Sequence, residues 1–383
     1  MKSNYKKIGD HICEVNIRNT ELKANTLLGI NIDKYYMPSV ANIVGTDMTA
    51  YKIVKKNQFA CNRMHVGRDY RLPVALSKSE NDFIVSPAYD VFEIIDTEKL
   101  LPEYLMMWFS RKEFDRNAWF FTDADVRGGL PWKSFCEMDL PVPKPDKQKE
   151  IVKEYHTIVN RIALNNQLIQ KLEETAQAIY KQWFVNEVDL ENLPAGWRIG
   201  RLEEMSELIN AGVIPKYTAQ GNDIVLGQKC VHDNYVDLQF ARPHNPKDNC
   251  LLVKFGDILI NSTGAGTLGR VGQVYFEPKR LTFDSNMTLV RAAKDCYIDY
   301  LGCFVSQKES HFVQISQGST NQTRLYCSMV CPVEILIPEE KVLEVFKNKV
   351  RKIRLLQQRI REENILLKKL NDLLLSKLAT IEN

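Results

Sequence analysis

The sequence predicts an α+β protein in which two globular segments of mixed α/β structure alternate with two long helices that pair as an antiparallel coiled coil. Two observations lead to this prediction: a residue pattern that occurs twice, and two heptad runs that each follow one copy of it. They divide the 383 residues into globular segments 1–146 and 187–338 and helical segments 147–186 and 339–383.

The two copies of the pattern are displaced by a constant 196 positions, as from Tyr104 to Tyr300 (300 − 104). The first copy is Tyr104-Leu105, Ser110 and Lys112-Glu113, and the second is Tyr300-Leu301, Ser306 and Lys308-Glu309. A solenoid is excluded, because its repeats are roughly 20 to 50 residues long. Two similar units held apart by helices suit a target with two parts.

Each globular segment has the pattern of short strands and turns with one helix. The expected strand segments include Phe83–Ile95, which is rich in β-branched and aromatic residues and is broken by a turn at Ser86-Pro87, and the strand-like Lys254–Ile260 and Val271–Phe276. The expected helices are Pro102–Phe114, which opens with proline in its first turn, and its repeat Ile298–Phe312.

The helical segments carry seams whose residues alternate in steps of four and three over more than four heptads, which is typical of a coiled coil. The seams are Ile151, Tyr155, Ile158, Ile162, Asn165, Ile169, Leu172, Ala176, Ile179 and Trp183, and Phe346, Val350, Ile353, Gln357, Ile360, Asn364, Leu367, Asn371, Leu374 and Leu378. Since each helix would be unstable alone, the two are expected to pack on one another; the alternative is that each helix only caps its own domain.

Asn165 and Asn364 interrupt the apolar seams near the midpoints of the two runs. A polar residue at a seam position costs stability but can fix the register of the helices. In an antiparallel pair the two amides are expected to meet and fix that register; the alternative is that they lie at a wet edge.

Composition indicates an ordinary globular protein rather than a membrane or secreted one. Lys and Arg number 51 against 48 Asp and Glu, a net charge of only +3, so charge alone does not indicate nucleic-acid binding. Nine cysteines are scattered singly, which favours a reduced, cytoplasmic setting over a disulfide framework. No window approaches the roughly 18 apolar residues of a membrane span.

Gly264-Ala-Gly266-Thr-Leu-Gly269 matches the dinucleotide fingerprint, with Asp284 following 20 residues after Gly264 (284 − 264). A dinucleotide site requires these glycines to open a helix, whereas here they lead into an alternating, strand-like segment. A glycine loop between strands can instead approach a phosphate closely, or can be a tight hairpin with no ligand. A nucleotide-dependent enzyme remains the rival hypothesis.

No other motif indicates chemistry. Cys230, His232, His244 and Cys250 lack the paired spacing of zinc ligands, so no metal site is expected. Neither an amino-methyltransferase signature nor a P-loop nor a G-x-S-x-G element occurs. The sequence therefore predicts a binding protein without catalysis and without a cofactor of its own, with a protein-only coiled-coil scaffold as a further alternative.

Several short segments together form a recognisable pattern. They are Leu193-Pro-Ala-Gly-Trp197 followed by Arg201-Leu202-Glu203, Gly256-Asp-Ile-Leu-Ile260 with Gly264 to Gly269, Phe59-Ala-Cys-Asn-Arg-Met64, and Ile84-Val-Ser-Pro-Ala-Tyr89 with Val91-Phe92. In this order they resemble the specificity subunit of type I restriction-modification enzymes. The resemblance covers essentially the whole chain and rests on the order of these elements. One departure is that the first segment begins at Tyr5–Asp10 without a Leu-Pro-x-Gly-Trp motif.

The resemblance implies a non-catalytic subunit that reads double-stranded DNA. Each globular segment would be a target-recognition domain for one half of a bipartite sequence, and the helices would set the spacing. Two methyltransferase subunits, and then restriction subunits, would dock on the helices. S-adenosylmethionine, Mg²⁺ and ATP would belong to those partners.

The candidate DNA-binding residues are polar and basic side chains in loops, because Arg, Asn and Gln can pair with base edges while Lys, Ser and Thr suit phosphates. In the first segment they are Asn62, Arg63, His65, Arg68, Arg71, Arg127 and Lys133. In the second they are Lys229, Asn261, Ser262, Thr263, Arg270, Asn321, Gln322 and Arg324. Each could also belong to a solvated loop without a ligand.

Overall fold

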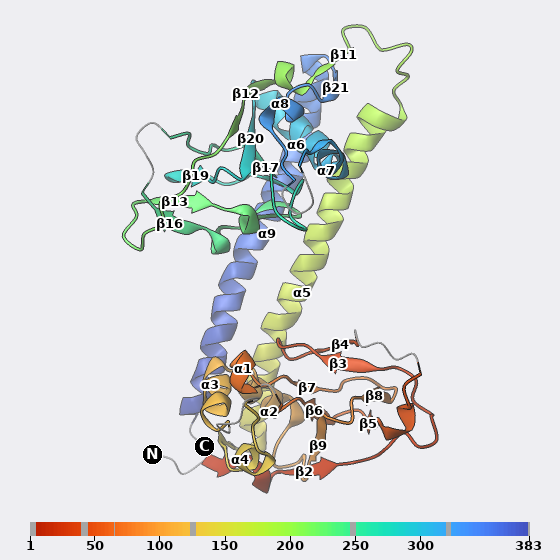
Figure 1. Ribbon diagram of the computed structural model, residues 1–383, viewed down its shortest axis with the longest axis vertical. Helices are drawn as coiled ribbons and strands as arrows, with labels where there is room; N and C mark the ends of the chain where they lie inside the picture. Colours follow the sequence, from red (N-terminus) through yellow and green to blue (C-terminus); the bar gives the residue numbers. More distant parts are fainter. Residues whose placement is uncertain are drawn as a thin grey trace. The chain divides into compact units, whose positions relative to one another are not determined.

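The computed structural model describes residues 5–39, 45–64, 66–122, 128–245, 250–318 and 323–381. It contains two compact units (Figure 1). Unit 1 combines Met1–Leu164 with Asn364–Asn383, and unit 2 is Asn165–Glu363. Each unit therefore holds one globular part and a portion of each long helix.

Unit 1 is built around a four-stranded antiparallel sheet in the order β2-β9-β6-β7, with three smaller strand pairs, β1–β10, β3–β4 and β5–β8. Its elements are β1 (Tyr5–Lys7), β2 (Ile12–Val15), β3 (Leu28–Ile30), β4 (Tyr36–Pro38), β5 (Lys52–Val54), β6 (Phe59–Cys61), α1 (Val66–Asp69), β7 (Val74–Leu76), β8 (Phe83–Val85), β9 (Asp90–Ile94), α2 (Pro102–Phe109), α3 (Lys112–Phe120), α4 (Trp132–Cys136) and β10 (Asp139–Pro141).

The core of unit 1 forms where aromatic side chains of the sheet meet those of α2 and α4. Phe59 of β6 stacks on Phe92 of β9 with ring centroids 5.0 Å apart, and Phe109 and Phe135 pack against them from the helices. Burial of each ring contributes about 1.5 to 3 kcal/mol. The buried hydroxyl of Tyr104 is satisfied by donating to the backbone oxygen of Pro141, 3.1 Å away.

Unit 2 contains a six-stranded sheet in the order β12-β20-β17-β18-β15-β14, a three-stranded sheet β16-β13-β19 and the pair β11–β21. Its elements are β11 (Arg198–Arg201), β12 (Ser206–Ala211), β13 (Asp223–Leu226), the 3-10 turn η5 (Gln228–Cys230), β14 (Val231–His232), β15 (Asn234–Val236), β16 (Arg242–His244), β17 (Ile258–Asn261), β18 (Val271–Gln273), β19 (Leu281–Phe283), β20 (Met287–Ala292), α6 (Ile298–Ser306), α7 (Glu309–Ile315), α8 (Cys327–Val330) and β21 (Glu334–Ile337).

The duplication seen in the sequence is also present in the strand pairing. The unit 1 order β2-β9-β6-β7 matches β12-β20-β17-β18 of unit 2, and every neighbouring pair in both sets is antiparallel. Tyr300, the repeat of Tyr104, donates its buried hydroxyl to the backbone oxygen of Leu336 at 2.5 Å. The repeated tyrosines therefore have the same role, tying the first helix after the sheet to the closing strand.

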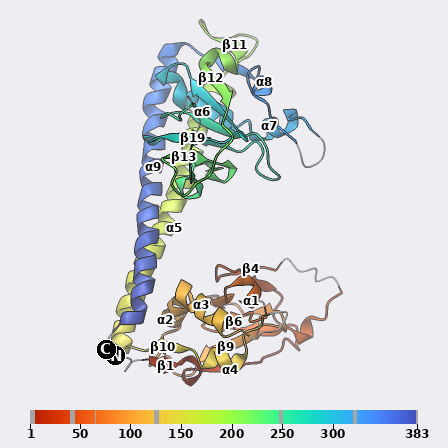
Figure 2. The same ribbon diagram turned by 60° about the vertical axis from the view of Figure 1, so that its left-hand side comes forward.

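The long helices are α5 (Pro145–Lys181), which ends in a π-helical turn at Gln182–Asn186, and α9 (Glu340–Lys377). Within each unit their segments lie side by side (Figure 2). In unit 2 the Gln357 side chain donates to the backbone oxygen of Ile169 at 3.0 Å, and Asn165 donates to Glu363 at 3.1 Å. The earlier residue of α5, Asn165, contacts the later residue of α9, Glu363, and the later residue of α5, Ile169, contacts the earlier residue of α9, Gln357. The predicted antiparallel pairing and the α+β class are therefore confirmed.

The globular part of unit 1 also packs against the C-terminal end of α9, and the globular part of unit 2 packs against the C-terminal end of α5. In unit 1, Leu375 and Leu378 of the C-terminal stretch join Ile151 in the main core. In unit 2, Tyr180 of α5 packs with Tyr300 and Phe346. Within the described parts of the chain, no helix combines the length and apolar composition needed to cross a membrane.

Candidate nucleic-acid interface

Most of the candidate residues fall on two loops that occupy the same place in the duplicated topology. In unit 1 the loop joins β6 to β7 and carries Asn62, Arg63, Arg68 and Arg71. In unit 2 it joins β17 to β18 and carries Ser262, Thr263 and Arg270, directly after Asn261 at the end of β17. The residues chosen from the sequence alone therefore fall on the same connection of the repeated strand order in both units.

The unit 1 loop is held rigidly at both ends. Val66 and Leu72 are fully buried in the core. Between them the backbone N–H of Gly67 donates to the backbone oxygen of Gly128 at 2.7 Å, and a Cβ added to Gly67 would lie 2.7 Å from the Gly128 Cα. Only glycine permits this approach, so the segment from Arg68 to Arg71 projects from a fixed base.

Arg63 is an internal brace in this loop. Its guanidinium pairs with Asp90 at 2.6 Å, donates to the backbone oxygen of Leu130 and lies over the Trp132 ring at 5.5 Å. Burial alone would lower the pKa of Arg63, but the hydrogen bond and charge of Asp90 outweigh it and raise the pKa. Because this guanidinium is engaged inside the protein, Arg63 supports the loop that carries the outer arginines.

Three other unit 1 candidates, Arg68, Arg71 and Lys133, face solvent. Arg68 makes a bidentate pair with its neighbour Asp69, at 2.7 and 3.0 Å, and Arg71 pairs with Asp33 at 2.8 Å. Lys133 on α4 is exposed, and its ammonium lies 4.0 Å from Glu137. Exposed pairs of this kind contribute little to stability, so these cations can exchange their partners for a ligand.

Asn62 is partly buried and shapes the loop locally. Its side-chain oxygen accepts a hydrogen bond from the backbone N–H of Met64 at 3.2 Å, while its backbone N–H donates to Pro73. Such a turn leaves the side-chain amide N–H groups as the outward donors.

In unit 2, Asn261 and Ser262 lie inside the protein. The Asn261 side chain is 0% exposed and donates to the backbone oxygen of Gln228 at 3.0 Å, and the Ser262 hydroxyl lies 2.8 Å from that of Thr288. Among the described residues, the Asn261 side-chain oxygen has no hydrogen-bond partner. These two side chains therefore tie the loop to η5 and β20.

Thr263 begins the exposed part of the loop and is held by hydrogen bonds from the side chain of Gln228. The Gln228 amide donates to the Thr263 hydroxyl at 2.7 Å and also to its backbone oxygen. This contact brings Lys229, which is exposed on η5, next to the glycine loop. The contact with Gln228 therefore links η5, which carries Lys229, to the start of the loop at Thr263.

The glycines at 264, 266 and 269 all have positive φ angles, of 105°, 73° and 83°. They close a turn in which the backbone oxygen of Gly264 accepts from the N–H groups of Thr267 and Leu268, and the chain then enters strand β18. A dinucleotide fingerprint needs a helix at this point, so the G-x-G-x-x-G string here is a strand-to-strand loop and not a nucleotide-binding turn.

Arg270 is exposed where this loop ends, close to Glu309 at the start of α7. Burial raises the pKa of Glu309, and the hydrogen bond from the backbone N–H of Val271 and the charge of Arg270 oppose it. Arg324 donates to the backbone oxygen of Ser285 at 2.6 Å and lies over the Tyr326 ring, and the backbone N–H of the next residue, Leu325, donates to Ser262. Arg270 therefore stands at the end of the glycine turn, and Arg324 lies next to a residue that contacts its start.

Four candidates, His65, Arg127, Asn321 and Gln322, lie outside the described residues. Asn165 and Asn364 are both buried, at 3% and 6% exposure, and their role in register stays a prediction. Within the described ranges, no three His, Cys, Asp or Glu side chains gather in a way that could hold a metal ion.

The sequence did not indicate a buried polar cluster between the long helices in unit 2. Arg354 of α9 is 3% exposed and pairs with Glu173 of α5, and its guanidinium also donates to Gln357 at 3.1 Å. Burial raises the pKa of Glu173, but the Arg354 charge and hydrogen bonds lower it further, so the net shift is downward. Arg354 is the neighbour of the seam residue Ile353, and this position beside the seam is the feature of the sequence from which its burial could have been predicted.

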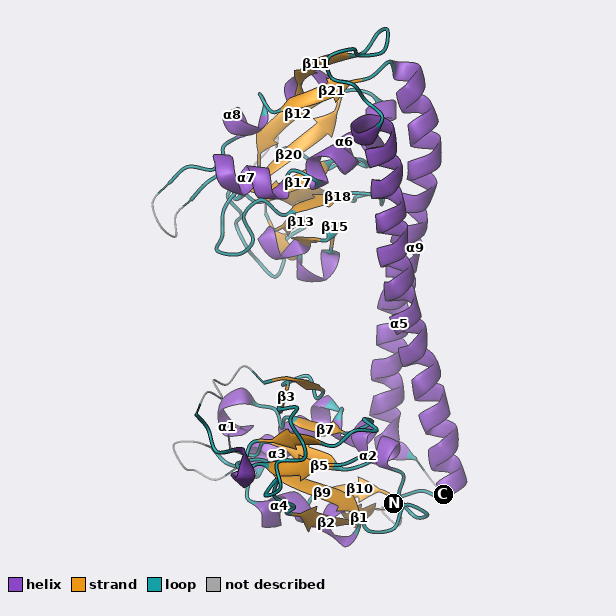
Figure 3. Cartoon of the chain, turned by 90° about the vertical axis from the view of Figure 1, so that its right-hand side faces the viewer, coloured by secondary structure: helices purple, strands orange, loops and turns teal. Residues whose placement is uncertain are grey.

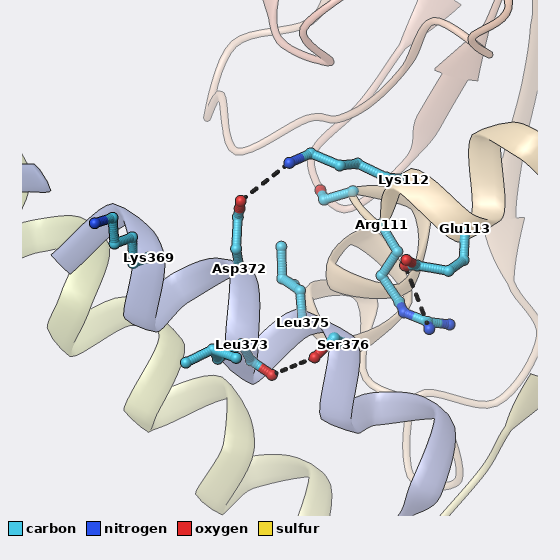
Figure 4. A pocket seen from close by; sticks show the side chains of 9 residues that line it. Arg111, Lys112, Glu113, Lys369, Asp372, Leu373, Leu375 and Ser376 are labelled. Atoms are coloured by element: carbon cyan, nitrogen blue, oxygen red, sulfur yellow. Dashed lines mark hydrogen bonds and ion pairs between the residues drawn. The ribbon is translucent and has the colours of Figure 1, made fainter. Parts of the chain in front are cut away.

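A pocket of about 500 Å³ in unit 1 lies where α3 meets α9 (Figure 4). Lys112 reaches across its mouth to Asp372 at 3.1 Å, and the buried Arg111 lines its wall beside Glu113. None of the predicted DNA-binding residues that the structure describes lines this pocket.

No protein-family model matches the chain. A curated relative, the type I restriction enzyme HindI specificity subunit of Haemophilus influenzae strain KW20, is 26% identical over 158 residues. The aligned segment covers 40% of this chain and spans about a third of the relative, 33% of its length.

Solved structures match over nearly the whole chain. The crystal structure of the S subunit of a type I restriction-modification system from M. genitalium covers 98% of this chain and 95% of its own, with a TM-score of 0.60 and 13% identity. A second structure, from work on assembly of a type I system, covers 98% and 96% with a TM-score of 0.48 and 16% identity. The resemblance inferred from the sequence is confirmed: along its whole length this chain has the fold of a type I restriction-modification S subunit.

Proposed function

We propose that this chain is the DNA-specificity subunit of a type I restriction-modification enzyme and reads a bipartite double-stranded target. In this proposal residues 1–146 and 187–338 are the target-recognition domains, and residues 147–186 and 339–383 are the spacer helices. The observation that carries the proposal is the duplicated loop: after β6 and after β17 the same topological position presents exposed cations from a braced base.

The exposed side chains suit the two kinds of contact that DNA offers. Arg68, Arg71, Lys229 and Arg270 can neutralise phosphates, and the arginines can pair with the acceptor edge of guanine. The glycine turn of unit 2 leaves backbone near Gly266 open, since a Cβ there would meet no atom within 4 Å. A phosphate can approach such a turn closely.

The chain is proposed to be non-catalytic, with methyltransferase and restriction subunits supplying the chemistry. Its sequence contains neither a methyltransferase signature nor a P-loop. S-adenosylmethionine, Mg²⁺ and ATP are then needed by the partners, which dock on the helices. The purified chain alone should neither methylate nor cleave DNA.

The test is to express the chain with its cognate methyltransferase subunit and to map the methylated bases. We expect methylation only when both proteins and S-adenosylmethionine are present, at two short half-sites separated by a fixed unread spacer. Robust methyl transfer by the isolated chain, or a continuous recognition sequence, would contradict the proposal. Binding of protein partners without specific DNA binding would support the scaffold alternative instead.

The spacing role of the helices has its own test. Adding one heptad to both α5 and α9 keeps their seams in phase and lengthens each helix by about 10 Å. At 3.4 Å per base pair the unread spacer should grow by about three base pairs while both half-sites stay the same. An insertion mutant that methylates with an unaltered spacer would show that the helices do not set the distance.

A further inference from the structure

An exposed aromatic pair lies at the tip of the unit 1 loop. The side chain of Tyr70 is 62% exposed and that of Trp119 is 45% exposed, and their ring centroids are 5.3 Å apart. Tyr70 follows α1 and Trp119 lies near the end of α3, two short helices in the globular part of unit 1 that pack against each other (Figure 3). Large aromatic side chains usually bury themselves, so such a pair in solvent indicates an interaction site.

The backbone presents Tyr70 at a conformational cost. Its φ angle is +57°, a left-handed conformation that a bulky residue rarely adopts. The backbone N–H of Tyr70 donates to the backbone oxygen of Val66 at 2.9 Å, and the contact between Gly67 and Gly128 fixes the preceding turn. A strained residue that the fold holds in place, with its side chain facing solvent, is more common at binding sites than elsewhere.

The charge around the pair favours DNA as its occupant. Arg68 and Arg71 stand on either side of Tyr70 in the chain, and both are solvent-exposed. Their partners Asp69 and Asp33 hold them in exposed ion pairs, which phosphate groups can replace because such pairs contribute little. Aromatic rings flanked by exchangeable cations suit a base face next to its backbone.

The corresponding loop of unit 2 offers no such pair. Between β17 and β18 it contains three glycines with positive φ and the aliphatic Leu268, but no aromatic residue. The aromatic pair is therefore not a general requirement of the duplicated fold. It belongs to the chemistry of unit 1.

We propose that Tyr70 and Trp119 form a stacking platform that contacts the face of a base at a locally opened step within the half-site read by unit 1. This inference rests on the proposed function. Aromatic side chains that enter between base steps unstack them and stabilise a distorted duplex, and every base offers a face on which a ring can stack.

The experiment uses the chain in complex with its methyltransferase subunit and duplexes that carry 2-aminopurine at successive positions of the unit 1 half-site. The complex should raise 2-aminopurine fluorescence at one step, and the rise should be absent with Tyr70→Ala or Trp119→Ala. Each alanine variant should bind the target roughly 5- to 150-fold more weakly, the range that the loss of about 1 to 3 kcal/mol of base stacking gives. Tyr70→Phe, which keeps the ring, should behave like the parent.

Phe120→Ala is the matched control, because Phe120 is more exposed than Trp119 and lies on the same helix but makes no ring contact with Tyr70 among the described residues. Parent-like DNA binding by both Tyr70→Ala and Trp119→Ala, with the unit 1 half-site still required, would overturn the inference and leave the proposed function standing. Loss of co-purification with the methyltransferase subunit, with no change in fluorescence, would identify a protein-docking surface and also overturn it. Absence of any sequence-specific binding by the parent complex would instead contradict the proposed function.

Discussion

The two units share a strand order but differ in how the long helices meet their globular parts. In unit 2, Arg354 and Glu173 form a buried pair across α9 and α5, and Gln357 adds a hydrogen bond to the backbone of Ile169. In unit 1, α9 instead meets α3 through the exposed pair of Lys112 and Asp372, whose side chains are 79% and 62% accessible. The comparison teaches that duplication preserved the apolar framework while the polar contacts diverged.

The same divergence separates the two candidate reading loops. Unit 1 presents Arg68 and Arg71 from a tip fixed by the Gly67–Gly128 contact, whereas unit 2 presents Arg270 beside a glycine turn. A framework that tolerates such different loops at one topological position can change its target without changing its fold.

The largest expected effect concerns the buried pair. Arg354→Met leaves the Glu173 carboxylate largely buried without its partner and should destabilise unit 2 by about 3 to 5 kcal/mol. Lys112→Ala in unit 1 should cost less than about 1 kcal/mol, because both partners are exposed. Urea unfolding followed by hydrogen exchange in each unit measures both values.

The double variant Arg354→Met, Glu173→Met is the control for the buried pair, because well-packed apolar replacements of a buried ion pair are often neutral. It should recover most of the lost stability. Equal losses of unfolding free energy for Arg354→Met and Lys112→Ala would contradict the predicted difference between the buried pair of unit 2 and the exposed pair of unit 1.

The next effect separates two glycines of one loop. Gly266→Ala should cost about 1 kcal/mol, since its positive φ disfavours a side chain but the space around it is open. Gly269→Ala should cost about 1 to 3 kcal/mol more, because its Cβ would lie 2.7 Å from the backbone oxygen of Glu309. Thermal unfolding compares them, and similar costs would mean that α7 yields to the added methyl group.

The smallest effect is a pH dependence. Burial raises the pKa of Glu173, but the charge and hydrogen bond of Arg354 hold it below the ordinary glutamate value of 4.5 in the folded protein. Its contribution to stability is therefore fully present above about pH 4.5 and is lost as the pH falls through the lower folded pKa, with a slope of at most about 1.4 kcal/mol per pH unit. Glu173→Gln should flatten this part of the stability curve, and a parallel curve for the variant would contradict the assignment.

Periodicity and repetition were sufficient to predict the fold class, because a heptad seam and a constant displacement between repeats can be recognised in the sequence without knowing which residues are in contact. The loops of the candidate site could also be found, since Arg68, Arg71 and Arg270 are polar residues between strand-like segments. The roles of Arg63 and Asn261 could not, because their partners Asp90 and Gln228 lie 27 and 33 residues away in the sequence. Arg354 was missed because its burial depends on packing against Glu173 and α6.

In the proposed function, each unit reads its own half-site. The direct measurement is binding of the complex with the methyltransferase subunit to targets in which one half-site or the other is scrambled, using the variants Arg68→Ala with Arg71→Ala and Lys229→Ala with Arg270→Ala. We expect the first variant to become insensitive to scrambling of one half-site and the second variant to scrambling of the other, with each lost base contact costing about 1 to 3 kcal/mol. Loss of discrimination at the same half-site by both variants would contradict it.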